Sequence, residues 1–155
     1  MAEPADLNPT IVDALYGEAL ELADAARAAF DLSGRLTRAS EDEDLARIAL
    51  SCEALRTTTR MMHAIAWLLN QRAYFAGELS EFQLRHHGRL PPRQSDPSPD
   101  QLALLAPELE DLIERTRRFY ARIERLDAAW RTRFAMHPEA IHRLRDRLGR
   151  AVAAL

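Results

Sequence analysis

Among the residues that could hold a metal ion, histidine and glutamate occur at one spacing in this 155-residue sequence that is known from metal centres. Glu139 and His142 have the Glu-x-x-His spacing with which helical bundles bind two iron ions. Such a centre needs a second copy of the motif and two further inward-facing carboxylates, and the sequence supplies neither. The adjacent His86 and His87 would point about 100° apart on a helix, whereas zinc-binding histidines usually stand three or four residues apart. We therefore expect no metal ion and no cofactor.

The residues that could act as nucleophiles or bind phosphate are equally few. Cys52 is the single cysteine, and it lies in an apolar helical pattern without a neighbouring group that would activate its thiol. A single cysteine cannot form an internal disulfide, which is typical of proteins in a reducing cytoplasm. The five glycines are isolated, so no Gly-x-Gly loop is present. We expect a cytoplasmic protein without enzymatic activity. Residues 1–4 do not predict a signal peptide. We also expect no membrane span, because the longest uncharged apolar run is only 64–69.

All 21 basic residues are arginines, and they are unevenly distributed. Residues 1–54 carry 4 arginines and 12 acidic residues, whereas residues 115–155 carry 11 arginines and 4 acidic residues. This gradient allows pairing of the acidic first part with the basic last part, within one chain or between chains. Seven arginines between 115 and 133 are interleaved with acidic residues on one expected helix. Since phosphate backbones favour an uninterrupted basic strip, a protein-binding or solvated face is favoured, with nucleic-acid binding as the alternative.

The stretch 67–75, Trp-Leu-Leu-Asn-Gln-Arg-Ala-Tyr-Phe, has apolar side chains pointing in several directions on a helix. Apolar residues around a whole helix indicate burial on several sides. Two interpretations stay open: burial beneath the following segment, or an interface with a second copy or another protein, where Trp, Tyr and Arg are typical anchors. The candidate partner-binding residues are Trp67, Asn70, Gln71, Arg72, Tyr74, Phe75, Glu78 and Arg85.

The elements that position these residues are expected to be helices. The sequence has 27 Ala and 23 Leu but only two Val and six Ile, a composition that favours helices over strands. Asn8 and Pro9 predict the start of a helix over 10–33, which Gly34 would end. The apolar residues of its buried face are Ile11, Leu15, Leu22, Ala26 and Phe30.

A second long helix is expected to begin at the capping box of Ser40 and Glu43 and to end before Gly77. We expect its apolar stripe to face the core; the stripe consists of Leu45, Ile48, Cys52, Leu55, Met62, Ile65 and Leu69. Ser80 and Gln83 predict a short helix that ends near residue 87.

The Pro-rich segment 88–100 is expected to be an exposed loop. A third long helix would begin at Asp100 or Pro107 and stop before Pro138. Its expected core face comprises Leu109, Leu112, Ile113, Thr116, Phe119, Tyr120, Ile123, Leu126, Trp130 and Phe134. The sequence thus predicts an all-α fold: an antiparallel three-helix bundle over 9–136 with long helices and a short connecting helix, after an N-terminal tail over 1–8.

The last segment, 137–155, is predicted to be a basic amphipathic helix. A helix of about 17 residues is marginal in isolation, so this one should dock on its own bundle or on a neighbouring protein. The residues expected to make that contact are Ile141, Leu144, Leu148 and Val152.

Residues 65–73, Ile-Ala-Trp-Leu-Leu-Asn-Gln-Arg-Ala, and 77–80, Gly-Glu-Leu-Ser, resemble the RcdA family, the alphaproteobacterial regulators of CtrA degradation. The order of helices is also similar to that family over about residues 10–135. The resemblance implies a dimeric three-helix bundle that has no catalytic activity and acts as an adaptor. Family members help to deliver cell-cycle regulators to the ClpXP protease. Their tails are polar, whereas 139–155 has an apolar stripe, so the cargo specificity of the family is not carried over.

Overall fold

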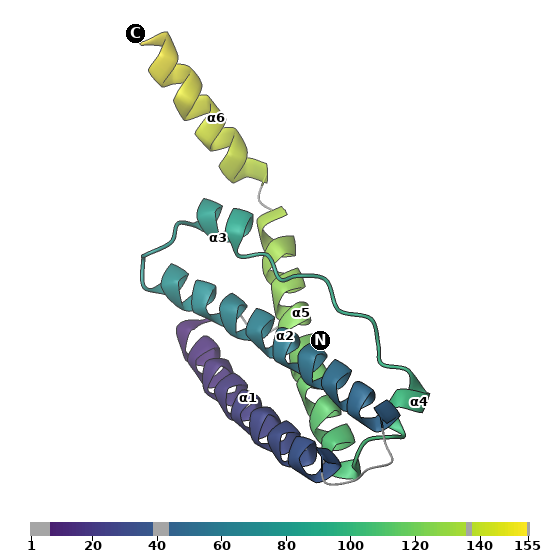
Figure 1. The fold of residues 1–155 in the computed structure, drawn as a ribbon. Helices are drawn as coiled ribbons and strands as arrows, with labels where there is room; N and C mark the ends of the chain where they lie inside the picture. Colours follow the sequence, from purple (N-terminus) through teal and green to yellow (C-terminus); the bar gives the residue numbers. More distant parts are fainter. Residues whose placement is uncertain (1–6, 39–43, 136–137, 155) are drawn as a thin grey trace, which may run out of the picture.

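The structure, a computed structural model, describes residues 7–38, 44–135 and 138–154, together with their side chains except those of 37–38 and 133–142. Within these ranges every regular element is a helix, which confirms the all-α prediction (Figure 1). Three of them are long and form a bundle. The helices are α1 (Pro9–Arg38), α2 (Asp44–Phe75), α3 (Glu81–His87), α4 (Pro99–Leu102), α5 (Pro107–Ala135) and α6 (Pro138–Ala153).

Helix ends follow the local sequence in most places. The side-chain oxygen of Asn8 accepts a hydrogen bond from the Ile11 N–H at 3.0 Å, and Ser80 and Gln83 form the predicted capping box. Gly77, at φ 79°, ends the turn after α2, where the N–H of Glu78 reaches back to the carbonyl of Ala73. The predicted capping box of Ser40 and Glu43 lies outside the described residues.

The prediction that Gly34 ends the first helix is wrong, because α1 continues to Arg38. Gly34 keeps a helical conformation, and the only positive φ among the described residues is at Gly77. A glycine within a helix costs only about 1 kcal/mol, which the packing of α1 against the bundle offsets.

α1 runs antiparallel to both α2 and α5, whereas α2 and α5 run in the same direction (Figure 1). The hydrogen bonds between α2 and α5 show this parallel direction. Arg60 donates to Thr116, and Trp67, further along α2, donates to Asp127, further along α5. This arrangement is possible because the chain after α3 returns along the length of the bundle before α5 begins. Asp100 and Pro107 were the two predicted starts of the third long helix. In the structure Asp100 lies in the single turn of α4, and the long helix α5 begins at Pro107.

The returning segment 88–98 has no regular secondary structure and is largely exposed, as predicted, but part of it packs on the bundle. Leu90 is buried in the main core cluster, and Pro97 is buried as well. The Tyr120 hydroxyl donates a hydrogen bond to the Pro91 carbonyl at 2.7 Å, which satisfies a backbone group that an extended segment leaves without an internal partner. We call residues 88–98 the strap.

The expected core faces of α1 and α5 are largely confirmed, but the expected core face of α2 is wrong. α2 packs on its neighbours with the opposite face, whose buried residues are Ala46, Ala49, Glu53, Thr57, Arg60, Met61, Ala64, Trp67, Leu68 and Gln71. The three alanines allow close approach of α1 and α5, and the larger apolar side chains fill the rest of the core. Most of the apolar stripe predicted to be buried therefore faces away from the bundle, whereas Ile65 of that stripe is partly buried and packs against the core.

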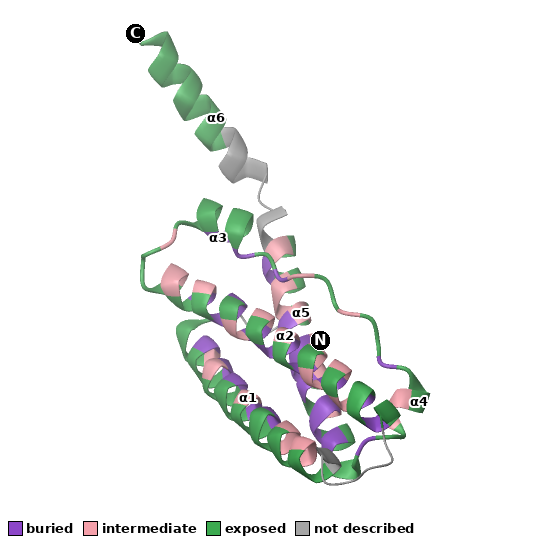
Figure 2. Cartoon of the chain, viewed as in Figure 1, coloured by how far each residue is buried: buried purple, intermediate pink, exposed green. Residues whose placement is uncertain are grey.

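α6 extends beyond the end of α5 in Figure 1, and all of its described side chains are exposed in Figure 2. Among the described helices, none has the length and apolar content required to cross a membrane.

Candidate protein-binding surface

One continuous apolar surface runs along the outward face of α2. Its larger members are exposed: Leu45 is 73% exposed, Leu55 69% and Met62 64%. A helix that buries one face in a bundle normally exposes polar residues on the other. We call this surface the α2 seam, and its residues are Leu45, Ile48, Cys52, Leu55, Thr59, Met62, Ala66 and Leu69.

The seam has the spacing of a coiled coil. Its positions are separated alternately by three and four residues from Leu45 to Leu69, which is the a and d pattern of a heptad repeat. The repeat extends over 24 residues, or about 36 Å of helix. A stripe with this period fits a second helix that lies nearly parallel or antiparallel to α2.

Polar side chains border the seam. Arg56 and His63 follow d positions, and Asp44 and Thr58 precede a positions. The Arg56 guanidinium lies 2.5 Å from a carboxylate oxygen of Glu53, which is fully buried behind the seam. An apolar centre with a polar rim is the usual anatomy of a protein–protein interface.

Two of the predicted partner-binding residues lie inside the bundle. Trp67 is 2% exposed, and its indole N–H donates a hydrogen bond to a carboxylate oxygen of Asp127 at 3.0 Å. Gln71 is also buried. The structure therefore corrects the interface interpretation for these two residues: they fill the junction between α2 and its neighbours, where a partner cannot reach them.

The other predicted partner-binding residues lie at the C-terminal end of α2, in the turn after it and on α3. Arg72 lies 3.1 Å from Asp13 and over the ring of Tyr16, so it ties α2 to α1. The rings of Tyr74 and Phe75 are in contact, with centroids 5.3 Å apart. Of the remaining three, Asn70 is half-buried, whereas Glu78 and Arg85 are exposed.

The predicted tail-docking residues are exposed where they are described. Leu144, Leu148 and Val152 are each more than half exposed, and the side chain of Ile141 lies outside the described ones. The described part of α6 thus presents a second apolar stripe that the bundle does not cover.

Residues 4–152 match a family described as "Protein of unknown function (DUF1465)". The chain belongs to this family. The match spans the bundle and nearly all of α6. Neither the curated proteins nor the solved structures give a match.

In this DUF1465 domain, the arginines of α5 are largely occupied by acidic partners. Arg122 pairs with Glu18 of α1, Arg131 pairs with Asp127, and Arg117 pairs with an acidic residue of the strap. Of these pairs, Arg122–Glu18 joins the acidic first part of the sequence to its basic last part within one chain, as the charge gradient allows. Pairing of this kind reduces the charge available to a phosphate backbone.

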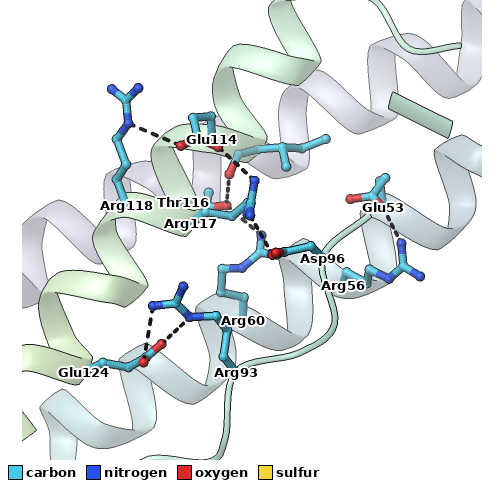
Figure 3. Close-up of polar contacts among 11 residues, drawn as sticks. Glu53, Arg56, Arg60, Arg93, Asp96, Glu114, Thr116, Arg117, Arg118 and Glu124 are labelled. Atoms are coloured by element: carbon cyan, nitrogen blue, oxygen red, sulfur yellow. Dashed lines mark hydrogen bonds and ion pairs between the residues drawn. The ribbon is translucent and has the colours of Figure 1, made fainter. Parts of the chain in front are cut away.

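A row of polar groups crosses the core of the DUF1465 domain between α2 and α5 (Figure 3). Thr116 is fully buried, accepts a hydrogen bond from Arg60 at 2.9 Å and donates one to the Ile113 carbonyl at 2.8 Å. Burial, and then the charge of Arg117, lower the pKa of the Arg60 guanidinium. Burial, and then the charge of Glu124, raise the pKa of Tyr120 to about 12.

This polar row does not contain the ligand set of a metal. In the part of the chain that the structure describes, no three residues of the ligand types His, Cys, Asp and Glu lie together. The sequence alone does not single out Arg60 or Glu53, because charged residues at helical spacing normally lie on the solvent face. Most residues of the seam belong to the apolar stripe that the sequence predicts, but the periodicity could not show that they face outward.

Proposed function

We propose that this protein is a helical interaction module that binds other proteins through the α2 seam, with a second copy of itself as the first partner. The observation that carries the proposal is a heptad stripe that remains exposed in the folded bundle. Exposed apolar patches of this length are typical of interfaces, because isolated monomers rarely keep them in water.

The seam is self-complementary when two copies pair antiparallel about its centre. Large residues then meet small ones in the inner layers, which fills space evenly. The opposing pairs are Leu45 with Leu69, Ile48 with Ala66, Cys52 with Met62, and Leu55 with Thr59. A parallel pairing would instead place Ala66 on Ala66 and Thr59 on Thr59, which leaves poorly filled layers. Because each contact occurs twice, this is the two-fold interface common in homodimers.

We further propose that the dimer acts as an adaptor in regulated proteolysis. The support is the resemblance of residues 65–73 and 77–80 to the RcdA family, whose members tether regulatory cargo to the ClpXP protease. The seam serves dimerisation, and the exposed stripe of α6 gives each copy a second surface for a protein. Tethering raises the effective concentration of cargo at the protease and requires no chemistry from the adaptor.

The alternative from another class is a nucleic-acid-binding regulator that uses the arginines of α5. It has less support, because Arg117, Arg122 and Arg131 already contact carboxylates. A nucleic-acid regulator would bind duplex DNA at moderate salt and lose affinity steeply as salt rises.

Affinity purification from the native host tests the adaptor proposal. The bait is the full chain, compared with a Leu144→Ser/Leu148→Ser double variant that keeps the seam intact. We expect the wild type to recover the ClpX unfoldase or a receiver-domain regulator, and the double variant to recover less cargo. The adaptor proposal fails if wild type recovers neither class and if deletion of the gene leaves the half-lives of cell-cycle regulators unchanged.

A further inference from the structure

A small pocket lies where α2, α5 and the strap meet, on a different side of α2 from the seam. Its volume is about 130 Å³, several times the space that one water molecule needs. Four arginines and two acidic residues line it; they are Arg60, Arg93, Arg117, Arg118, Asp96 and Glu114. The lining thus carries a surplus of positive charge.

The two carboxylates of the pocket are already engaged. Arg117 donates to Asp96 at 2.6 Å and to Glu114 at 3.0 Å, and the Nε of Arg118 lies 3.4 Å from Glu114. These contacts hold Arg117 in place between the strap and α5 (Figure 3). Arg93 is fixed in the same way, since its fork contacts both carboxylate oxygens of Glu124 at 2.8 and 3.3 Å.

Arg60 differs from these three arginines because it is buried without an ion pair to any described residue. It is 7% exposed, and its guanidinium donates a hydrogen bond to the neutral hydroxyl of Thr116. A buried guanidinium normally has a carboxylate or phosphate partner, because removing a charge from water is costly. Glu53 and Asp96 act on Arg60 only as nearby charges, and the pocket is the side on which an anion could supply a direct partner.

A second unmatched group points to the kind of anion. Gln94 lines the same pocket, and its Oε1 is buried without a hydrogen-bond donor among the described residues. A hydrogen phosphate carries both the oxygens that arginine forks bind and one O–H that can donate to such an oxygen. A carboxylate or a sulfate offers acceptors alone at neutral pH.

We propose that this pocket binds a phosphoryl group, either as free phosphate or at the end of a small phosphorylated metabolite. Arg60 faces the negative charge from α2, Arg118 closes the site from α5, and Gln94 accepts the phosphate hydroxyl from the strap. Because these groups come from α2, α5 and the strap, the bound anion joins three parts of the chain and stabilises the folded state.

Titration of the full chain with inorganic phosphate tests this site, by calorimetry and by thermal unfolding at pH 7 with ionic strength held constant with sodium chloride. We expect saturable binding and a rising unfolding temperature in wild type, and at least tenfold weaker binding after Arg60→Gln. Arg118→Gln keeps the test valid if the buried substitution unfolds the chain, because Arg118 is 77% exposed. Arg89→Gln is the matched control: Arg89 is exposed, stands outside the pocket, and should leave binding unchanged.

Further titrants identify the ligand chemistry. Sulfate and acetate should bind more weakly than phosphate, and Gln94→Leu should remove the preference for phosphate over sulfate. A sugar phosphate that binds more tightly than inorganic phosphate would show that the ligand is a metabolite, and the reverse order would favour the free ion. The proposal is wrong if wild type shows no saturable binding, if Arg60→Gln and Arg118→Gln bind like Arg89→Gln, or if acetate binds as tightly as phosphate.

Discussion

At the scale of single residues, hydrogen bonds between polar groups that lie far apart in the sequence hold the helices together. Trp67 bonds Asp127, Arg60 bonds Thr116, and Tyr120 bonds the Pro91 carbonyl. Each bond joins α5 to α2 or to the strap. The sequence predicted that Trp67, Thr116 and Tyr120 could be buried, but not their partners, because hydrogen bonds between residues 29 to 60 positions apart leave no local signal.

Trp67 is expected to be a stability residue. Trp67→Ala removes a buried ring and leaves Asp127 without its indole donor, so it should lower the free energy of unfolding by about 3–5 kcal/mol. Urea denaturation followed by circular dichroism measures the change. Phe75→Ala, at the more exposed end of α2, is the control and should cost far less. Equal losses in the two variants would contradict the core position of Trp67.

Tyr120 makes stability depend on alkaline pH. Its pKa is raised from 10.0 to about 12 in the folded protein, because burial and then Glu124 disfavour the phenolate. The stabilisation is therefore complete below pH 10 and is lost as the pH rises from 10 to 12. Between these values, wild type should lose on the order of 2 kcal/mol more than Tyr120→Phe, measured by urea denaturation at each pH. Parallel stability curves for the two proteins would show that the phenol does not titrate in this way.

At the scale of elements, α2 has two faces that could each have formed a core. Its apolar stripe follows a heptad, whereas its buried face combines alanines with Thr57, Arg60 and Gln71. Periodicity indicates that an apolar face exists, but it cannot show whether that face meets the same chain or another one. The burial of the less apolar face is what makes the stripe a candidate interface.

Cysteine cross-linking tests the antiparallel pairing of two α2 helices. In that arrangement Cys52 lies opposite Met62 of the second copy, so Met62→Cys should give a covalent dimer under oxidising conditions. Wild type, with Cys52 alone, should remain uncrosslinked. Non-reducing electrophoresis provides the measurement. Efficient cross-linking of wild type would indicate a parallel pairing, in which Cys52 meets its own copy, and would contradict the proposed geometry.

α6 is expected to contribute little to the stability of the bundle. Because Leu144 and Leu148 are exposed, the Leu144→Ser/Leu148→Ser variant should unfold within about 0.5 kcal/mol of wild type in urea. Leu109→Ser, in the buried face of α5, is the contrasting variant and should lose more than 2 kcal/mol. A large loss in the α6 variant would mean that this helix packs on the folded core.

At the scale of the whole molecule, the domain is a bundle closed by its strap, with apolar surface left on α2 and α6. The sequence predicted the all-α class, the three long helices and the core faces of α1 and α5. These features follow from helix-capping residues and from the helical spacing of apolar residues. It did not predict that α2 and α5 run parallel or that the strap is packed. Both depend on the return of residues 88–98 along the bundle. The composition of this segment predicts only a loop.

The central claim is that the α2 seam holds two copies together. Light scattering coupled to size-exclusion chromatography measures this directly, with Leu55→Glu compared with Leu20→Glu, a substitution at a partly exposed leucine of α1 outside the seam. We expect a dimer for wild type and Leu20→Glu, and a monomer of unchanged helicity for Leu55→Glu, because the charge would be buried at the centre of the interface. A monomeric wild type, or a Leu55→Glu variant that remains dimeric, would contradict the claim.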